Sequence, residues 1–342
     1  MMHLNQRGRK HMVNSWTGFD QLKEVWLGDC YPVEYYNGTS SAVYDAFARI
    51  TEITQTDLAE IETILKQQGV IVHRPRFTCK EDYVNEHGVL IKPPIMPRDD
   101  SMALGNNFYH LRNNYKTDPW QHQLNLIGDH AVSITPELDC LGPPSIVRVG
   151  ADLYIDYDTH KHVWGMVGST FVDWAKDYRV HIIETGGHSD GVFCPVAEGI
   201  IVASCWMEEY NHTFPNWKVF QLPQEHTVHF GKWWIDDDSI TNNNAFADHI
   251  NQYALDWIGD FTETQFSVNM LVVNEKTVIS VNENRELNDW LDSNGINVII
   301  APFRAKSFWD GGLHCLTVDT IRNGTKRDFF PHRRTKHYLD WQ

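Results

Sequence analysis

The stretch Leu-Asn-Asp-Trp-Leu-Asp-Ser-Asn-Gly-Ile-Asn-Val-Ile-Ile-Ala-Pro, residues 287–302, contains one complete structural unit. Its apolar residues Leu287 and Leu291 are one helical turn apart, which predicts a helix with one buried face. Gly295 then supplies the left-handed conformation that commonly ends a helix. The apolar run 296–301 predicts a buried strand, and the proline after it predicts a loop.

The same unit occurs elsewhere in the chain. Residues 58–75 repeat the helix, the glycine (Gly69) and the strand, and a weaker copy covers 171–183. A second recurring element is a hairpin with a glycine or polar turn. The hairpins are predicted at 102–109, 146–155, 196–202 and 270–279, and residues 25–29 are expected to begin a fifth. Strands interleaved with helices at this spacing favour a closed array of α/β modules over a single wound sheet. An ordinary mixed α/β domain is the alternative.

The composition indicates an ordinary globular protein. The 342 residues are 42% hydrophobic, enough for one large domain or two smaller ones. The first ten residues are polar and basic with no apolar stretch behind them, so we expect neither a signal peptide nor a membrane span. The 45 acidic and 29 basic residues give a net charge of −16, which argues against nucleic acid as a partner and favours cationic ligands. Six cysteines without a CxxC pair predict free thiols in a reducing cytoplasm.

Two glycine-flanked loops carry the groups that reactions need. Gly186-Gly187-His188-Ser189-Asp190 and Gly311-Gly312-Leu313-His314-Cys315 each follow an apolar, strand-like run. Together they supply a thiol, an imidazole and a carboxylate, the minimum set for covalent cysteine chemistry. A third loop, Pro97-Arg98-Asp99, adds another carboxylate. In a closed array, the modules would bring Asp99, His188 and Cys315 to one central cleft.

In this interpretation Cys315 is activated by His188 as proton carrier, and a cationic substrate would itself stabilise the thiolate. If its loop is extended, Asp190 lies on the same side as His188, where it suits a planar cation such as a guanidinium. Each residue also has a plainer interpretation: Cys315 as a small buried apolar residue, His188 as a surface histidine, Asp190 as a turn residue. His188, Asp190, His314 and Cys315 also resemble a zinc or iron ligand set, but adjacent residues such as His314 and Cys315 rarely bind one ion.

Three separated segments resemble motifs of the glycine (arginine:glycine) amidinotransferase family, one of the guanidino-group-modifying enzymes of the pentein fold. Residues 311–319 are similar to the family's nucleophile motif, and residues 187–190 to its His-x-Asp motif. Residues 97–99 match the early motif and its spacing. The resemblance covers residues 18–328. It implies a closed α/β propeller in which five pseudo-repeated ββαβ modules surround a central active-site cleft.

The resemblance implies an enzyme that moves the amidino group of L-arginine to glycine or another primary amine and releases ornithine. Cys315 would be the nucleophile and His188 the general acid and base. Asp190 and Asp99 would contact the guanidinium or the substrate backbone. The intermediate would be an amidino-cysteine, and the scheme needs no cofactor and no metal. The expected partners are therefore small molecules, without nucleic acid or membrane, and a homodimer is left open.

Two positions depart from the family pattern. Direct alignment puts Gly142 where the family has an aspartate that assists the histidine, and the nearest carboxylate, Asp139, would require a small insertion. Met207 stands where the family has an arginine that grips the substrate carboxylate. Two alternatives therefore remain. One is arginine deiminase- or dihydrolase-type hydrolysis of a guanidino compound, and the other is a non-catalytic pentein-fold binding protein.

The expected organisation is one large domain with polar ends. Residues 1–17 form a polar extension, residues 18–328 the amidinotransferase-like domain, and residues 329–342 a basic C-terminal tail. Residues 207–250 break the repeat and are predicted to be an insertion that caps the domain or the cleft.

Overall fold

The computed structural model describes residues 13–111, 114–128, 131–133, 142–156, 174, 176–183, 188–204, 213–222, 238–258, 266–281 and 283–333. Two residues singled out from the sequence, Asp139 and Met207, lie outside the described residues, as do the glycines at 186 and 187. Most of the two predicted terminal segments also falls outside them.

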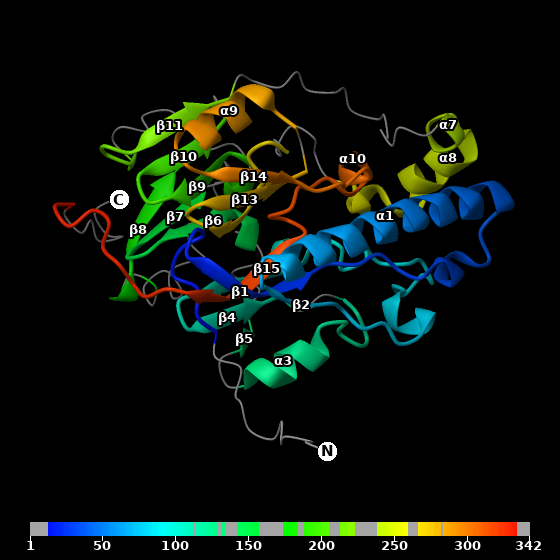
Figure 1. The fold of residues 1–342 in the computed structure, drawn as a ribbon. Helices are drawn as coiled ribbons and strands as arrows, with labels where there is room; N and C mark the ends of the chain where they lie inside the picture. The colour runs from blue at the N-terminus through cyan, green and yellow to red at the C-terminus, as the bar shows by residue number, and fades with distance from the viewer. Residues whose placement is uncertain are drawn as a thin grey trace, which may run out of the picture.

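Five three-stranded sheets form the framework of the molecule (Figure 1). In every sheet the central strand pairs antiparallel with one neighbour and parallel with the other. The repeated unit predicted from the sequence is therefore confirmed, and the fold is mixed α/β. The sheets are β15-β1-β2 (Thr317–Asn323, Gln21–Leu27, Ile71–His73), β3-β4-β5 (Ser101–Leu104, Asn107–His110, Ala131–Ser133), β6-β7-β8 (Ile146–Val149, Asp152–Asp156, Arg179–Ile183), β9-β10-β11 (Phe193–Ala197, Ile200–Ala203, Lys218–Gln221) and β12-β13-β14 (Leu271–Asn274, Thr277–Ser280, Asn297–Ile300).

The two ends of the chain meet in the first of these sheets. Strand β1 pairs antiparallel with β15, with Leu27 opposite Thr317. The expectation that residues 25–29 begin a local hairpin is therefore wrong. The antiparallel partner of β1, strand β15, comes from the far end of the sequence, so no short turn connects the two strands. This pairing places Cys315 two residues before β15, an edge strand of the first sheet.

Glycine ends the two longest helix–strand units as the sequence predicts. Helix α1 (Ser41–Gln67) is followed by Gly69 with φ +76°, and helix α9 (Arg285–Ser293) is followed by Gly295 with φ +78°. In both units the next residue donates a backbone hydrogen bond back to the last turn, Val70 to Leu65 at 3.1 Å and Ile296 to Leu291 at 3.0 Å. Only glycine adopts this φ without strain, so it ends the helix and turns the chain into the strand.

Part of the stretch 207–250 completes a repeated unit. Its residues 218–221 are β11, the third strand of the fourth sheet. Further on, α7 (Asp238–Thr241) and α8 (Asn244–Tyr253) lie above one end of α1 (Figure 1). The Asn243 side chain accepts from Phe246 N at 3.0 Å and donates to Ala42 O at 2.8 Å, which both begins α8 and fastens it to α1.

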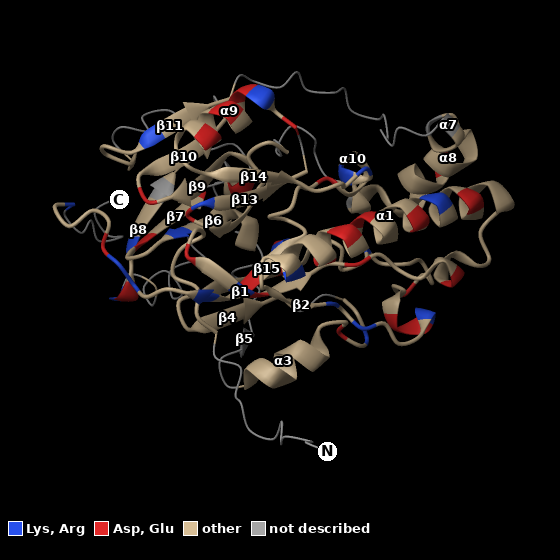
Figure 2. Cartoon of the chain, in the orientation of Figure 1, with Lys and Arg blue, Asp and Glu red and all other residues tan. Residues whose placement is uncertain are grey.

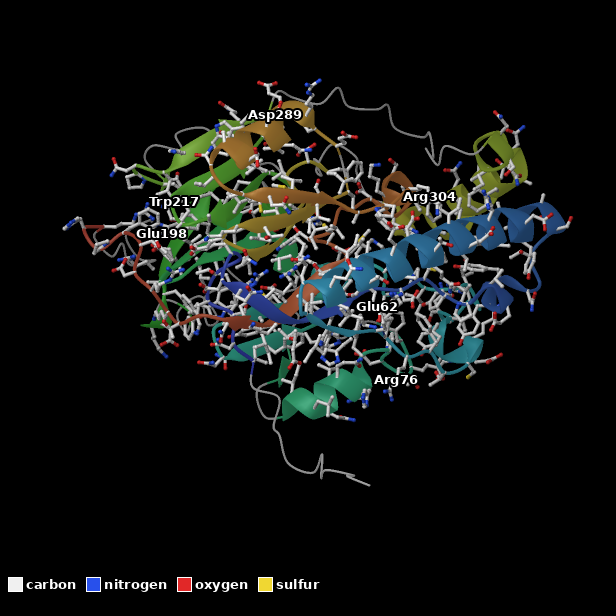
Figure 3. All side chains as sticks on the ribbon, viewed as in Figure 1. Glu62, Arg76, Glu198, Trp217, Asp289 and Arg304 are labelled. Atoms are coloured by element: carbon white, nitrogen blue, oxygen red, sulfur yellow. The ribbon has the colours of Figure 1, made fainter. Side chains whose placement is uncertain are left out.

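Ion pairs connect α1, and residues near both ends of the described chain, to other parts of the fold. Acidic residues are spread along α1 (Figure 2). One residue of this helix, the buried Asp57, accepts from Nη2 of Arg304 at 2.7 Å; Figure 3 labels Arg304 beside α1. Near the C-terminus, Arg327 pairs with Asp20 at 3.0 Å and with Glu198 at 3.2 Å. In the described part of the predicted basic tail, Arg333 donates from Nη1 to the Tyr154 hydroxyl at 2.7 Å and pairs with Asp152 at 3.4 Å. Across the described ranges, no helix is long and apolar enough to cross a membrane.

Candidate active site

Cys315 lies in a tight turn directly before β15 and is 2% exposed. Leu316 N donates to Gly312 O at 3.1 Å, and Thr317 N donates to His314 O at 3.1 Å. The Thr317 hydroxyl donates to Leu313 O at 2.7 Å. These bonds fix the turn against the start of the strand, so the thiol has a defined position.

Asn269 holds Cys315 by both the backbone and the side chain of the cysteine. The fully buried Asn269 donates through Nδ2 to the Cys315 Sγ at 3.0 Å and accepts at Oδ1 from the Cys315 N–H at 3.0 Å. It lies in the segment that leads into β12. The space around it is tight, because a Cβ on Gly312 would come within 2.6 Å of the Asn269 carbonyl oxygen. Glycine at 312 is therefore needed for this close approach.

The carboxylate of Asp190 joins the two predicted loops. Its Oδ2 accepts from Nδ1 of His314 at 2.7 Å and lies 3.5 Å from the Cys315 Sγ. Its Oδ1 is buried and has no hydrogen-bond partner within the described part of the chain. Burial alone would raise the pKa of Asp190, but the hydrogen bond and charge of His314, with the charges of His188 and Arg98, lower it. Asp190 is therefore an ionised carboxylate with one oxygen still available to a donor.

The third predicted loop lies against the same turn. It forms the short helix α2 (Pro97–Asp100), and the Arg98 N–H donates to the Cys315 carbonyl at 3.3 Å. Asp99, with 32% of its side chain exposed, pairs with Lys92 Nζ at 3.4 Å. Burial opposes the charge on Lys92, but Asp99, Asp100 and Asp310 together raise its pKa. The structure thus brings Asp99, Asp190 and Cys315 together from three separate segments.

The environment keeps the Cys315 thiol protonated in the free protein. Burial, followed by the charges of Asp190 and Asp99, raises its pKa well above the ordinary value, and the hydrogen bond from Asn269 opposes this shift only partly. A cation placed between these carboxylates would act in the opposite direction. The site is therefore arranged so that a positively charged ligand would promote formation of the thiolate.

His188 precedes the short 3-10 helix η6 (Ser189–Gly191). The condition of an extended loop is therefore not met at Asp190, which lies within a helical turn. His188 itself is extended and partly exposed, and its charge is one of those that lower the pKa of Asp190. Gly191 N donates to His188 O at 2.9 Å, which fixes the backbone between the histidine and the carboxylate.

A buried cluster of charges anchors the strand that follows Cys315. Asp319 on β15 is 1% exposed and accepts from Arg98 Nη2 at 2.8 Å. Arg148 and Arg322 bind its other oxygen. Although burial opposes ionisation, these arginines hold the pKa of Asp319 well below its usual range. Burial, with the charges of Arg98 and Arg322, lowers the pKa of Arg148 to about 10, and the charge of Asp319 opposes this shift only partly. This charge cluster joins α2 and β6 to β15.

A small cavity of about 30 Å³ lies beside Asp190. Asp190, His314 and Arg148 supply its polar lining, and Phe193 and Met270 are among its apolar residues. Nε of Arg148 is buried and lacks a hydrogen-bond partner among the residues described. Within the described chain, no group of three or more His, Cys, Asp or Glu side chains is arranged to hold a metal ion.

The sequence interpretation missed two contacts of the site. Asn269 was not singled out from the sequence, although an amide inside Val268-Asn269-Met270-Leu271 is itself a signal of a buried polar role. His314 was considered only as a metal ligand, whereas in the structure it is the hydrogen-bond partner of Asp190.

The sequence comparison and the structure comparison both find amidinotransferases. No family model matches the chain. Glycine amidinotransferase, mitochondrial, from Gallus gallus is 21% identical over 216 residues, which cover 58% of this chain. The match spans 42% of the length of that curated relative, so its activity as a whole protein does not transfer directly.

Solved structures of amidinotransferases share the fold over nearly the whole chain. SxtG, an amidinotransferase of saxitoxin biosynthesis from Microseira wollei, has a TM-score of 0.68 with 18% identity and covers 93% of this chain and 99% of its own. Inosamine-phosphate amidinotransferase StrB1 from Streptomyces griseus gives 0.65 with 16% identity and the same coverage. The N-terminal domain of ArgZ, a cyanobacterial arginine dihydrolase, gives 0.54 with 16% identity, covering 89% and 98%. The resemblance to the amidinotransferases is confirmed at the level of fold: the chain has the pentein fold of the solved amidinotransferases and is similar in sequence to glycine amidinotransferase over part of its length.

Proposed function

We propose that this protein is an amidinotransferase that moves the amidino group of L-arginine to a primary amine through an amidino-cysteine at Cys315. One observation carries the proposal. Asp190 places one carboxylate oxygen 3.5 Å from the Cys315 sulfur, and its other oxygen is buried with no donor among the described residues. A guanidinium bound there would donate to the unpartnered oxygen of Asp190 and place its carbon next to the Cys315 sulfur.

The first half of the reaction cleaves arginine. The guanidinium binds between Asp190 and Asp99, and its charge offsets the two carboxylates that hold the thiol proton. His188 accepts that proton, and the sulfur attacks the guanidinium carbon. The bond between that carbon and Nε of arginine then breaks. His188 returns the proton to this nitrogen, and ornithine leaves.

The second half discharges the enzyme. An acceptor amine attacks the amidino carbon and gives its proton to His188, and the carbon–sulfur bond breaks to regenerate the Cys315 thiolate. Glycine or another primary amine fills the acceptor role, so the partners are two small molecules used in turn. All the groups come from the chain, and the scheme draws on no cofactor.

Contacts between sheets support a closed ring around this site. β15 touches β3, β1 touches β12, β12 touches β9, and η6 touches both β6 and β9. Met102 of the second sheet packs with Leu153 of the third in one buried cluster. We infer that the five modules form a closed propeller and that Cys315 and Asp190 lie near its axis.

Hydrolysis is the second candidate, and the likeness in fold to an arginine dihydrolase favours it. The two reactions share the first half and differ in whether water or an amine takes the amidino group from Cys315. An amidinotransferase must therefore keep water from the intermediate until the amine arrives.

Intact-mass analysis with arginine labelled in the guanidino carbon tests the proposal. We expect a mass gain equal to one labelled amidino group, absent in Cys315→Ala and retained in Cys79→Ala, the matched change at an exposed free cysteine. Discharge by glycine or another amine supports transfer, and discharge by water alone supports the hydrolase. Wild-type protein that gains no label from arginine would favour the non-catalytic alternative.

A further inference from the structure

The segment that leads into α2 brings a lysine to the turn that contains Cys315. Met96 of this segment lies against that turn, because a Cβ on Gly311 would come within 2.7 Å of the Met96 Cε and 2.9 Å of the Cys315 Cβ. Four residues earlier, the Lys92 carbonyl accepts from the Tyr115 hydroxyl at 2.6 Å. The backbone of Lys92 is therefore held in place next to the site.

The ammonium of Lys92 pairs with the carboxylate of Asp99. Its Nζ lies 3.4 Å from Asp99 Oδ2, and 28% of the lysine side chain is exposed. Burial disfavours the charge on Lys92, but the carboxylates of Asp99, Asp100 and Asp310 raise its pKa. Lys92 is therefore a cation throughout the neutral pH range.

Two carboxylates oppose the ionisation of Cys315, and their partners differ. After burial, the charges of Asp190 and Asp99 are the largest causes that raise the pKa of the thiol. Asp190 accepts from His314, and burial lowers the pKa of this histidine, so the partner loses its charge toward neutral pH. Asp99 has the ammonium of Lys92 instead, which keeps its charge.

We propose that Lys92 is the counter-ion that sets the reactivity of Cys315: by pairing with Asp99 it offsets a carboxylate charge that opposes formation of the thiolate. A carboxylate with an ammonium 3.4 Å away acts on the sulfur as a dipole, whose field is weaker than that of a full charge. Because Lys92 acts through Asp99, it is a positioning residue and need not touch a substrate. The inference rests on the proposed function only in taking Cys315 as the reacting group.

Other ionisable groups surround these residues and stay the same in every variant compared below. Their charges act on the thiol, on Lys92 or on the pair of Asp190 and His314, and they are Asp100, Asp310, His188, Arg98 and Asp319. A difference between the variants therefore reports on the pair of Lys92 and Asp99.

Timed alkylation by iodoacetamide, a neutral reagent, tests the proposal, with the exposed Cys79 as the reference thiol in the same chain. Lys92→Gln removes the ammonium and leaves Asp99 uncompensated. We expect Cys315 to react at least about threefold more slowly at about pH 8, the effect of a thiol pKa about half a unit higher. The profile of rate against pH should move to higher pH. Lys92→Arg keeps a cation beside Asp99 and should react at nearly the wild-type rate.

A double variant separates an effect of charge from an effect on structure. Asp99→Asn alone should speed the alkylation of Cys315, because it removes one of the charges that oppose the thiolate. Lys92→Gln combined with Asp99→Asn removes both members of the pair, so it should react faster than Lys92→Gln alone. If Lys92 served only to hold the chain in place, the double variant would be at least as slow as Lys92→Gln.

Lys66→Gln breaks a comparable pair, Lys66 with Glu62 at 2.6 Å on α1, and as the matched control should leave the rate at Cys315 unchanged. A wild-type rate and pH profile in Lys92→Gln would overturn the proposal. So would slow alkylation that Lys92→Arg does not restore and Asp99→Asn does not relieve. Because alkylation requires no arginine, these measurements remain decisive even if arginine never labels Cys315.

Discussion

The side chain of Asn269 binds Cys315 at two points, its Nδ2 donating to Sγ and its Oδ1 accepting from the backbone N–H, each at 3.0 Å. Of the groups that influence the thiol most strongly, this amide is the one that favours the thiolate, while burial, Asp190 and Asp99 disfavour it. The reactivity of the cysteine therefore depends on an uncharged neighbour that also fixes its position.

Replacing Asn269 with aspartate tests that relationship. The variant keeps an oxygen for the Cys315 N–H but puts a carboxylate oxygen in place of the donor to the sulfur. We expect the thiol pKa to rise by at least about one unit, which slows alkylation of Cys315 by iodoacetamide about tenfold at pH 8. Peptide mass mapping after timed labelling measures the rate. Asn297→Asp, at an exposed position on β14, is the matched control and should leave it unchanged.

Replacing Asp190 with asparagine should move two measurements in opposite directions. Removing this charge lowers the raised pKa of Cys315, so iodoacetamide should label the cysteine faster than in wild type. The same change removes the proposed anchor of the guanidinium, so formation of the arginine adduct should fall at least about a hundredfold. If both rates fell together, Asp190 would be acting on the position of the turn rather than on charge.

His314 is expected to position Asp190 rather than to contact the substrate. Its Nδ1 donates to Asp190 Oδ2 at 2.7 Å, and an asparagine amide reaches nearly the same place. His314→Leu should raise the KM for arginine roughly tenfold, the effect of losing one hydrogen bond to a charged group. His314→Asn should keep the KM for arginine close to the wild-type value. Steady-state kinetics that showed a loss in kcat alone, equal in both variants, would contradict this role.

Much of the framework could be predicted because its signals are local. The glycines at 69 and 295 follow helical apolar periodicity and precede apolar runs, and both end helices at positive φ. The hairpins around β3–β4 and β12–β13 carry their turn residues within a few positions of each strand. Cys315 was expected at a loop-to-strand junction for the same reason, since Gly311-Gly312 and the following apolar run bracket it.

The features that sequence reasoning missed depend on contacts between distant segments. The pairing of β1 with β15 joins residues about 300 positions apart, with no turn to announce it. Arg98, Arg148 and Arg322 are individually ordinary charged residues, and only the fold shows that they share the buried carboxylate of Asp319. The conformation around Asp190, which the sequence left open, is a 3-10 turn because hydrogen bonds from Gly191 and Val192 close it locally.

Asp319→Asn should destabilise the protein by about 3–5 kcal/mol, because three buried arginines lose their counter-charge. The pKa of Asp319 is lowered in the folded state, so its contribution is present above the unfolded value near about 3.9 and is lost as the pH falls toward the folded pKa. The free energy of unfolding, measured in urea, should therefore fall less steeply below about pH 4 in the variant than in wild type. The exposed pair Arg285–Asp289 gives the control Asp289→Asn, which should change stability by less than about 1 kcal/mol.

Gly312→Ala tests whether the turn that contains Cys315 has any spare room. The added Cβ would lie 2.6 Å from the Asn269 carbonyl oxygen and 2.9 Å from its Oδ1, so either the turn or the amide must move. Overpacking of this kind costs about 1–3 kcal/mol, and the shift should break the bonds that Asn269 makes to Cys315. We expect lower stability in urea together with slower alkylation of Cys315. Gly18→Ala, where a Cβ meets nothing within 4 Å, is the control and should leave both unchanged. Wild-type alkylation in a destabilised Gly312→Ala would mean that the thiol does not depend on the amide, and the role assigned to Asn269 would fail with it.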